Sequence, residues 1–147
     1  MFIIDTLSSV LKYLQDGKTN YYPAVKTIDV YKGQLAEAMK GKQIITLSDP
    51  LPAVYMVMID DNPLAEDPVH NIDLVIIAES KVFNKGEKQT AAYSASDNIC
   101  SYINSNQGWD YSGVPYMIDK ERVKITHLMT DNKYTILNMN LTIKNLK

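Results

Sequence analysis

Residues 51–78 read LPAVYMVMIDDNPLAEDPVHNIDLVIIA, and this stretch decides the fold. Its two apolar runs, 53–59 and 72–78, are rich in Val, Ile, Tyr and Met and show no strict alternation with polar residues. Such runs are typical of strands that are covered on both faces. The polar segment 60–71 between them is too short for a crossover helix, so we predict an antiparallel pair at the centre of a sheet.

The chain before this pair is predicted to hold one long helix and one short strand. In residues 2–16, apolar positions recur every third or fourth residue, which is typical of an amphipathic helix, and Gly17 is expected to end it. The β-branched segment 27–31 predicts a short strand. A short helix is predicted for 34–39, and the apolar patch within 42–50 has no firm assignment.

A second helix is predicted at about residues 89–104, where apolar residues fall on one helical face. Small residues along it allow a close approach to the sheet. The turn-forming residues of 104–113, with Gly108 as the break, are expected to close this helix. The residues predicted to face the sheet are Ala92, Ala95, Ile99, Tyr102 and Ile103.

Two alternating segments, 122–130 and 134–145, predict a C-terminal β-hairpin with its turn at residues 131–132. Apolar residues at every second position are typical of a strand with one face in the core and the other in solvent. The predicted core-facing residues are Val123, Ile125, His127 and Met129 in the first strand, and Leu137, Met139, Leu141 and Ile143 in the second.

These segments predict one α+β domain over residues 1–147. It has a mostly antiparallel sheet of about four to five strands, an N-terminal helix and a second long helix packed on it, and a C-terminal β-hairpin. Fifteen basic and 17 acidic residues give a net charge of −2, which argues against a strongly basic nucleic-acid binder. Cys100 is the single cysteine and fits a reducing compartment, and no apolar run reaches the roughly 18 residues of a membrane span.

Motifs for catalysis are missing from the sequence. The glycines form no phosphate-binding loop pattern. The soft metal ligands His70, His127 and Cys100 lack paired spacing, so we expect a solvated loop histidine, a partly buried strand histidine and a small apolar filler, respectively. We therefore predict no catalytic, cofactor-binding or metal site, and a chain that is not an enzyme.

The acidic residues Asp60, Asp61, Glu66 and Asp67 gather in one loop between the central strands. Several carboxylates on one loop can bind a hard cation such as Ca²⁺, but the regular alternation and the glycine of a calcium loop are missing. The prolines favour a stiff, solvated hairpin tip. We therefore predict a charged surface loop that either discourages wrong contacts or meets a basic partner.

Two further groups of residues are predicted to contact other molecules. Lys81, Lys85 and Lys88 form a basic loop, and a basic loop beside an acidic one suits head-to-tail packing of identical subunits. Trp109 and Tyr111 lie in a polar segment, and large amphipathic rings outside the core are enriched at protein interfaces. The alternative for these aromatic residues is local packing as loop anchors.

Several short segments follow one another in an order that carries a family resemblance. They are IDVYKGQLAEAM at 28–39, LPAVYMVM at 51–58, NIDLVIIAES at 71–80, the alanine-bearing helix at 90–103, and the closing strands RVKITHL and YTILNMNLTI. In this order and over nearly the whole chain, the sequence resembles the Mu-like phage tail-completion family, whose members are similar to the tail terminators of long-tailed phages.

The resemblance implies an α+β subunit that forms a ring, expected to be a homohexamer, on the head-proximal end of a completed tail tube. Such a ring ends polymerisation of the tube protein and presents a surface to the neck or connector, and in contractile tails also to the sheath. It implies no catalytic residues, no sequence-specific nucleic acid and no membrane. The expected location is the bacterial cytoplasm during assembly and then the virion tail or a phage-tail-like particle.

Two alternative functions remain open from the sequence. One is a small-ligand-binding α+β regulatory domain, which predicts a concave apolar pocket with convergent polar groups. The other is a metal-dependent hydrolase that uses Asp60, Asp61 or His70. Ring formation separates the terminator from both alternatives, and metal analysis of the purified protein tests the hydrolase.

Overall fold

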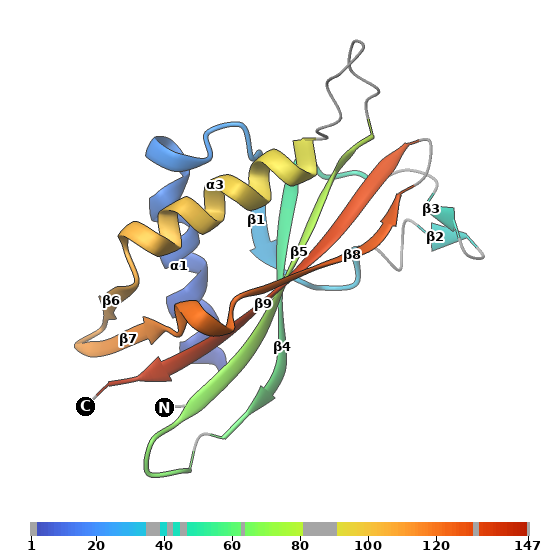
Figure 1. Cartoon of the computed structure of the whole chain (residues 1–147). Helices are drawn as coiled ribbons and strands as arrows, with labels where there is room; N and C mark the ends of the chain where they lie inside the picture. The colour runs from blue at the N-terminus through green and yellow to red at the C-terminus, as the bar shows by residue number, and fades with distance from the viewer. Residues whose placement is uncertain are drawn as a thin grey trace.

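The computed structural model describes residues 3–34, 39–40, 43–44, 47–62, 64–80, 91–130 and 133–146. Its elements, in chain order, are α1 (Ile3–Tyr21), β1 (Thr27–Val30), β2 (Met39–Lys40), β3 (Gln43–Ile44), β4 (Ala53–Asp61), β5 (Val69–Glu79), α3 (Ala91–Ser105), β6 (Gly108–Tyr111), β7 (Val114–Ile118), the 3-10 turn η1 (Lys120–Arg122), β8 (Lys124–Thr130) and β9 (Tyr134–Asn145). The two long helices lie on one side of a strongly twisted sheet (Figure 1), which makes the fold α+β as predicted.

The centre of the sheet is the antiparallel pair predicted from residues 51–78. β4 pairs with β5, and β5 pairs along its whole length with β9, so β5 and β9 form the longest ladder. The strand order is β1-β4-β5-β9-β7-β6, and β8 also pairs with β9. β7 and β8 therefore share one edge of β9, with η1 between them in the chain.

The prediction of a mostly antiparallel sheet of four to five strands is wrong, because the sheet is mixed and has seven strands. β1 runs parallel to β4, with Thr27 opposite Ala53 and Val30 opposite Met56. The turn-rich segment predicted as a loop instead forms the β6–β7 hairpin, whose tight turn uses positive φ at Ser112 and Gly113. A Gly-rich polar segment resembles a loop in sequence even where tertiary pairing makes it a strand.

The helix predictions are largely confirmed. α3 packs on β5 and β9, α1 packs on β1 and β4, and the two helices contact each other. The predicted sheet-facing residues of α3 are all buried: Ala92, Ala95, Ile99, Tyr102 and Ile103. Of the short helix predicted at 34–39, residues 35–38 lie outside the described residues, and Met39 begins β2.

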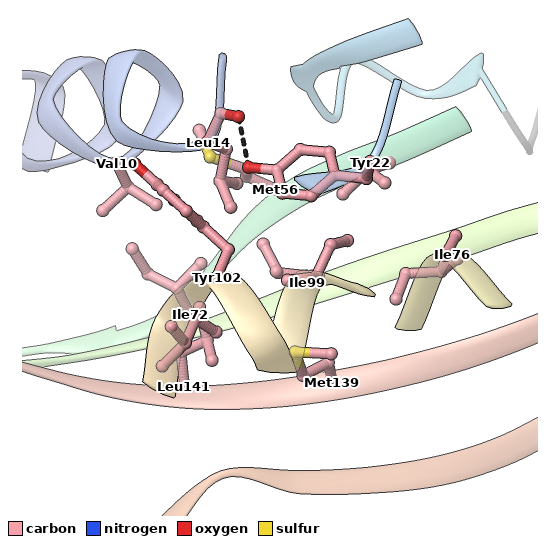
Figure 2. Packing of buried hydrophobic residues seen from close by; sticks show 14 of the residues in the cluster. Val10, Leu14, Tyr22, Met56, Ile72, Ile76, Ile99, Tyr102, Met139 and Leu141 are labelled. Carbon is pink, nitrogen blue, oxygen red and sulfur yellow. Dashed lines mark hydrogen bonds between the residues drawn. The ribbon is translucent and has the colours of Figure 1, made fainter. Parts of the chain in front are cut away.

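The main core lies between the helices and the sheet. Figure 2 shows side chains from α1, α3 and the three central strands meeting in one layer, where Ile72, Ile99 and Leu141 are fully buried. The predicted core face of β9 is confirmed, since Leu137, Met139, Leu141 and Ile143 are all inaccessible to solvent. This layer fixes the positions of the surfaces described below.

Gly17 lies inside α1 and does not end it, contrary to the prediction. A Cβ atom there would lie 2.6 Å from the ring of Tyr102 and from the hydroxyl of Tyr22. The Tyr102 hydroxyl donates to the Tyr13 carbonyl at 2.9 Å, and the Tyr22 hydroxyl donates to the Leu14 carbonyl (Figure 2). The glycine therefore admits two tyrosine rings against the helix backbone, a packing role that local sequence rules assign to a helix end.

The second face of the sheet is covered at one end. There Ala53, Tyr55 and Ile77 form a satellite cluster with Leu47 and Ile136. Along the rest of β5 and β9, this face carries polar pairs such as Asp73 and Asn140, whose side chains are hydrogen-bonded at 2.8 Å. The expectation that both faces of the central strands are covered therefore holds for the first half of β4 and for residues 76–78 of β5, which are buried on both faces, and not for the rest of the pair.

The core face predicted for residues 122–130 is wrong at Ile125 and His127, whereas Val123 is half-buried against the main core. Ile125 is 42% exposed, and His127, predicted as partly buried, lies in solvent. β8 is one strand further out than β9, the last strand on which α3 packs, so no helix layer within the described ranges covers it. A register shift between His127 and Met129 also turns Met129 to the opposite face, where it packs on the satellite cluster beside Ile136.

Candidate interaction surfaces

The β4–β5 hairpin has a buried base. Asp61 and His70 lie opposite each other on β4 and β5, and the His70 ring contacts the Asp61 carboxylate through Nδ1. Its Nε2 lies 3.0 Å from the side-chain oxygen of Asn145 on β9. The His70 and Asp61 side chains are 0% and 4% exposed. The predictions of a solvated loop histidine and of a surface role for Asp61 in the loop miss this contact, which ties three strands together.

Sequence reasoning missed this contact because it placed both residues in the loop. β4 continues to Asp61 and β5 begins at Val69, so the connection is only residues 62–68. The signal was the β-branched Val69 beside His70, which extends the second apolar run backwards. In this position the histidine lies on the helix-covered face of β5, the same face as Ile72 and Leu74.

The tip of the same hairpin is largely exposed, and we call its described residues 62 and 64–67 the hairpin tip. Leu64 is 87% exposed, more than any other large apolar residue in the described chain, and Glu66 and Asp67 are exposed beside it. The Ala65 amide donates to the Asn62 carbonyl at 3.2 Å and closes a turn that presents Leu64. The tip therefore combines an apolar side chain with the negative charge predicted for this loop.

Asp60 lies just outside the tip, on the strand. It is exposed and accepts a hydrogen bond from the Asn71 side chain at 2.7 Å. The four predicted acidic residues are thus separated by burial, since Asp61 faces the core and the other three face solvent. The predicted basic partners Lys81, Lys85 and Lys88 lie outside the described residues.

Trp109 and Tyr111 lie on β6, in the hairpin that sequence analysis read as a loop. Trp109 stacks between Tyr13 of α1, with ring centroids 4.1 Å apart, and Tyr116 of β7, at 5.6 Å. Its indole N–H donates to the Ser9 hydroxyl at 2.8 Å. These contacts match the local-anchor alternative for Trp109. Both aromatic residues remain half-buried and border a surface hollow of about 150 Å³.

A larger groove lies between α3 and β8, and we call it the α3–β8 groove. It has a volume of about 330 Å³. Its lining residues are Cys100, Ile103, Asn104, Lys120, Val123 and Ile125. The polar residues at its rim bond to each other, since Lys120 Nζ donates to Asn104 Oδ1 at 3.2 Å. The groove therefore has apolar walls and one positively charged side chain, Lys120, at its rim.

The groove exists because β8 extends past the cover of α3. Val123 and Ile125 follow the apolar alternation of a core strand, yet the helix reaches only as far as β9 and leaves them as a groove wall. Cys100 forms part of the facing wall and is half-buried. Burial, and secondarily the nearby Asp97 carboxylate, raises the pKa of the Cys100 thiol above its ordinary value. The thiol is thus neutral and apolar in character at neutral pH.

The outer edge of β8 is a second feature of the same region. Among the described residues, β9 is the only strand that pairs with β8, so the backbone of its other edge faces outward. The register shift leaves Leu128 as an unpaired bulge residue that is 54% exposed. Bulges are one way in which proteins limit edge-to-edge pairing of strands.

Among the residues that the structure describes, no group of three or more His, Cys, Asp or Glu side chains is arranged to hold a metal ion. In the same ranges, neither helix is both long and apolar enough to cross a membrane.

No protein-family model matches the chain. No curated protein is significantly similar to it in sequence.

Proposed function

We propose that this chain is a structural subunit of a phage tail or a phage-tail-like machine. Copies of it form a ring, expected to be a hexamer, at the head-proximal end of the tail tube, where the ring ends tube polymerisation and joins the tail to the neck. The proposal starts from the resemblance to tail-completion proteins. The segments that carry the resemblance correspond in order to β1, β4, β5, α3, β8 and β9, with residues 35–38 of the first segment outside the described residues. Because one fold can host many functions, the proposal also rests on the exposed surfaces of the chain.

One observation carries the proposal: the chain exposes large apolar side chains on two separate elements. Ile59, 52% exposed, and Leu64 belong to the β4–β5 hairpin, whereas Ile125 and Leu128 belong to β8. Contiguous exposed apolar patches mark interaction sites, whereas single exposed apolar side chains are common, and the proposal takes each of the two pairs as part of one such patch. Two different surfaces on one chain support head-to-tail contacts between copies, and such contacts generate a ring when the rotation closes.

The mechanism of a terminator ring needs no bond chemistry. One face of the ring matches the last layer of the tube, so binding energy holds it at the tube end. Its other face does not reproduce the self-complementary face of the tube protein, so stacking of further layers ceases. That outer face is then available to neck, connector or sheath proteins. Assembly takes place in the bacterial cytoplasm, and the ring stays in the finished particle.

Tail assembly in the presence and absence of the chain tests the proposal. With the chain, electron microscopy should show tubes of uniform length that carry an extra ring at one end and join to heads. Without it, tubes should be overlong or unjoined, and mass measurement of the purified chain with tube protein should show about six copies per tube end. Tubes of normal length that still join heads in its absence would refute the proposal.

The α3–β8 groove is the observation that favours the second candidate, a small-ligand-binding regulatory domain. It is concave and largely apolar, as that candidate requires. Its two polar side chains are already bonded to each other and do not converge on a shared ligand atom. Mass spectrometry of the native protein distinguishes the candidates, because a regulatory domain should carry or bind a small molecule as a monomer or dimer that ignores tubes.

A further inference from the structure

We infer that the hairpin tip of one copy docks into the α3–β8 groove of the next copy in the ring. This inference rests on the proposed function and assigns the two surfaces through which neighbouring subunits meet. Leu64 is the apolar side chain that enters the groove, and Glu66 and Asp67 approach Lys120 at its rim. The partner is therefore a second copy of this chain, bound head to tail.

The hairpin tip has the properties of a docking element. Leu64 is 87% exposed, although a leucine gains about 1.5–3 kcal/mol when it is fully buried. The turn closed by Ala65 and Asn62 holds it outward. The buried contact between Asp61 and His70 holds the base of the hairpin from which the tip projects.

The groove has room for this side chain. An apolar cavity of about 150 Å³ is known to admit a six-carbon ring. The α3–β8 groove has about 330 Å³, which exceeds the space needed for the four-carbon side chain of leucine and leaves room for the adjoining backbone. Its apolar walls come from Ile103, Val123 and Ile125, so a leucine placed there exchanges water for aliphatic contacts.

The charges around the two surfaces are complementary. Lys120 at the groove rim bonds only to the neutral Asn104 among the described residues, so its charge lacks a carboxylate partner there. Asp119 is already paired with Arg122 at 3.4 Å and with Lys144 at 3.7 Å. The carboxylates of the tip are exposed next to Leu64. Docking of Leu64 therefore brings Glu66 and Asp67 toward Lys120. This attraction favours a hairpin orientation that places the two carboxylates on the Lys120 side of the groove.

The two surfaces cannot satisfy each other within one chain. The high exposure of Leu64 shows that it does not occupy the groove of its own chain. The tip is the turn between β4 and β5, whereas the groove lies between α3 and β8, in a different part of the molecule (Figure 1). Each copy thus offers one tip and one groove. This is the arrangement of a heterologous contact, which forms a ring when the rotation between neighbouring copies closes.

The native Cys100 in the groove wall provides a direct test. An Asn62→Cys variant keeps Leu64 and carries one thiol on the tip and one in the groove, and a short bismaleimide should link the two thiols between neighbouring copies on tube ends. The expected product is a ladder of dimers, trimers and larger species up to the ring. The wild-type chain, with Cys100 alone, and the Asn62→Cys/Cys100→Ser variant should stop at dimers or remain unlinked. Because residue 62 is exposed, the substitution should leave folding unchanged.

A second experiment keeps the test independent of the linker. Leu64→Ser should shift the chain from ring mass to monomer mass, whereas Leu146→Ser, which removes a leucine that is 41% exposed elsewhere, should not. Lys120→Glu should weaken ring formation, and adding Glu66→Lys in the same chain should restore it.

The outcomes separate this inference from the proposed function. Wild-type rings on tube ends, together with no ladder and an unchanged ring mass for Leu64→Ser, would overturn the docking inference and leave the terminator role standing. A wild-type chain that neither self-associates nor binds tubes would overturn both. A small molecule found bound in the groove of a monomeric chain would overturn the inference in favour of the regulatory domain.

Discussion

β9 and β8 are neighbouring strands with similar sequence patterns and opposite environments. Ile125 of β8 is paired directly with Met139 of β9, so the two side chains lie side by side on the same face of the sheet. Met139 is fully buried, whereas Ile125 is 42% exposed. The difference in exposure comes from α3, which packs on β5 and β9 and does not extend over β8. An apolar position in a strand is buried only where another layer lies above it.

This difference separates two roles for apolar residues in the same sheet. Under α3 they hold the fold together, and beyond α3 they form the wall of a groove and an exposed strand. The same contrast occurs within the β4–β5 hairpin, where Asp61 is buried and the adjacent Asp60 is exposed. Substitutions at matched positions on the two sides of this boundary can therefore test whether burial, and not residue type, sets the energetic effect.

The largest effect is expected at the buried base of the β4–β5 hairpin. Asp61→Ala removes the carboxylate that His70 contacts and leaves a buried polar ring without that partner, which should cost about 3–5 kcal/mol of unfolding free energy. Asp60→Ala removes an exposed carboxylate and should stay within about 0.5 kcal/mol. Urea denaturation of both variants measures the difference. Equal losses would show that the contact to His70 does not stabilise the fold.

The cross-strand pair of β8 and β9 gives the next largest effect. Met139→Ala creates a cavity beneath α3 and should cost about 2–5 kcal/mol. Ile125→Ala removes a half-exposed side chain from the same face and should cost less than about 1.5 kcal/mol, because no closed cavity forms. Urea midpoints for both variants test this ranking. A loss at Ile125 as large as that at Met139 would mean that another layer covers β8.

The contact between the two covering helices gives a smaller effect. Gly17→Ala gains helix propensity of about 1 kcal/mol, but its Cβ would lie 2.6 Å from the Tyr102 ring and from the Tyr22 hydroxyl. Overpacking of this kind costs about 1–3 kcal/mol, so the variant should be destabilised or at best neutral. Gln15→Ala, on the exposed side of α1, is the control and should be neutral or slightly stabilising. A stabilised Gly17→Ala protein would show that the rings move aside at no cost.

The smallest effect concerns Cys100, which lies at the boundary between the covered centre and the groove. Burial raises the pKa of its thiol, and the reactive thiolate is therefore scarcer than in a free cysteine at the same pH. Labelling with N-ethylmaleimide should be slower than for a free thiol at neutral pH. It should keep accelerating as the pH rises beyond the ordinary thiol range. A labelling rate that matches free cysteine at every pH would place Cys100 in open solvent.

Local sequence rules predicted the parts of the fold whose patterns match their surroundings. The antiparallel pair of β4 and β5, the buried face of α3 and the core residues of β9 all follow from apolar periodicity, because these elements are covered where their apolar residues point. The exposed, acidic character of Glu66 and Asp67 was also predictable from their charge and the nearby prolines. The groove was not predictable, because it depends on how far across the sheet α3 extends.

The sequence by itself determined which residues are apolar, with what period, and which segments can be helix or strand. Tertiary structure alone decided that β1 runs parallel to β4, that Gly17 receives two tyrosine rings, that His70 meets Asp61 in the core and that Ile125 borders a groove. The physical reason is that periodicity reports the local geometry of one segment, whereas burial depends on the element packed against it. That element lies far away in the chain, and its reach is set by packing across the whole sheet.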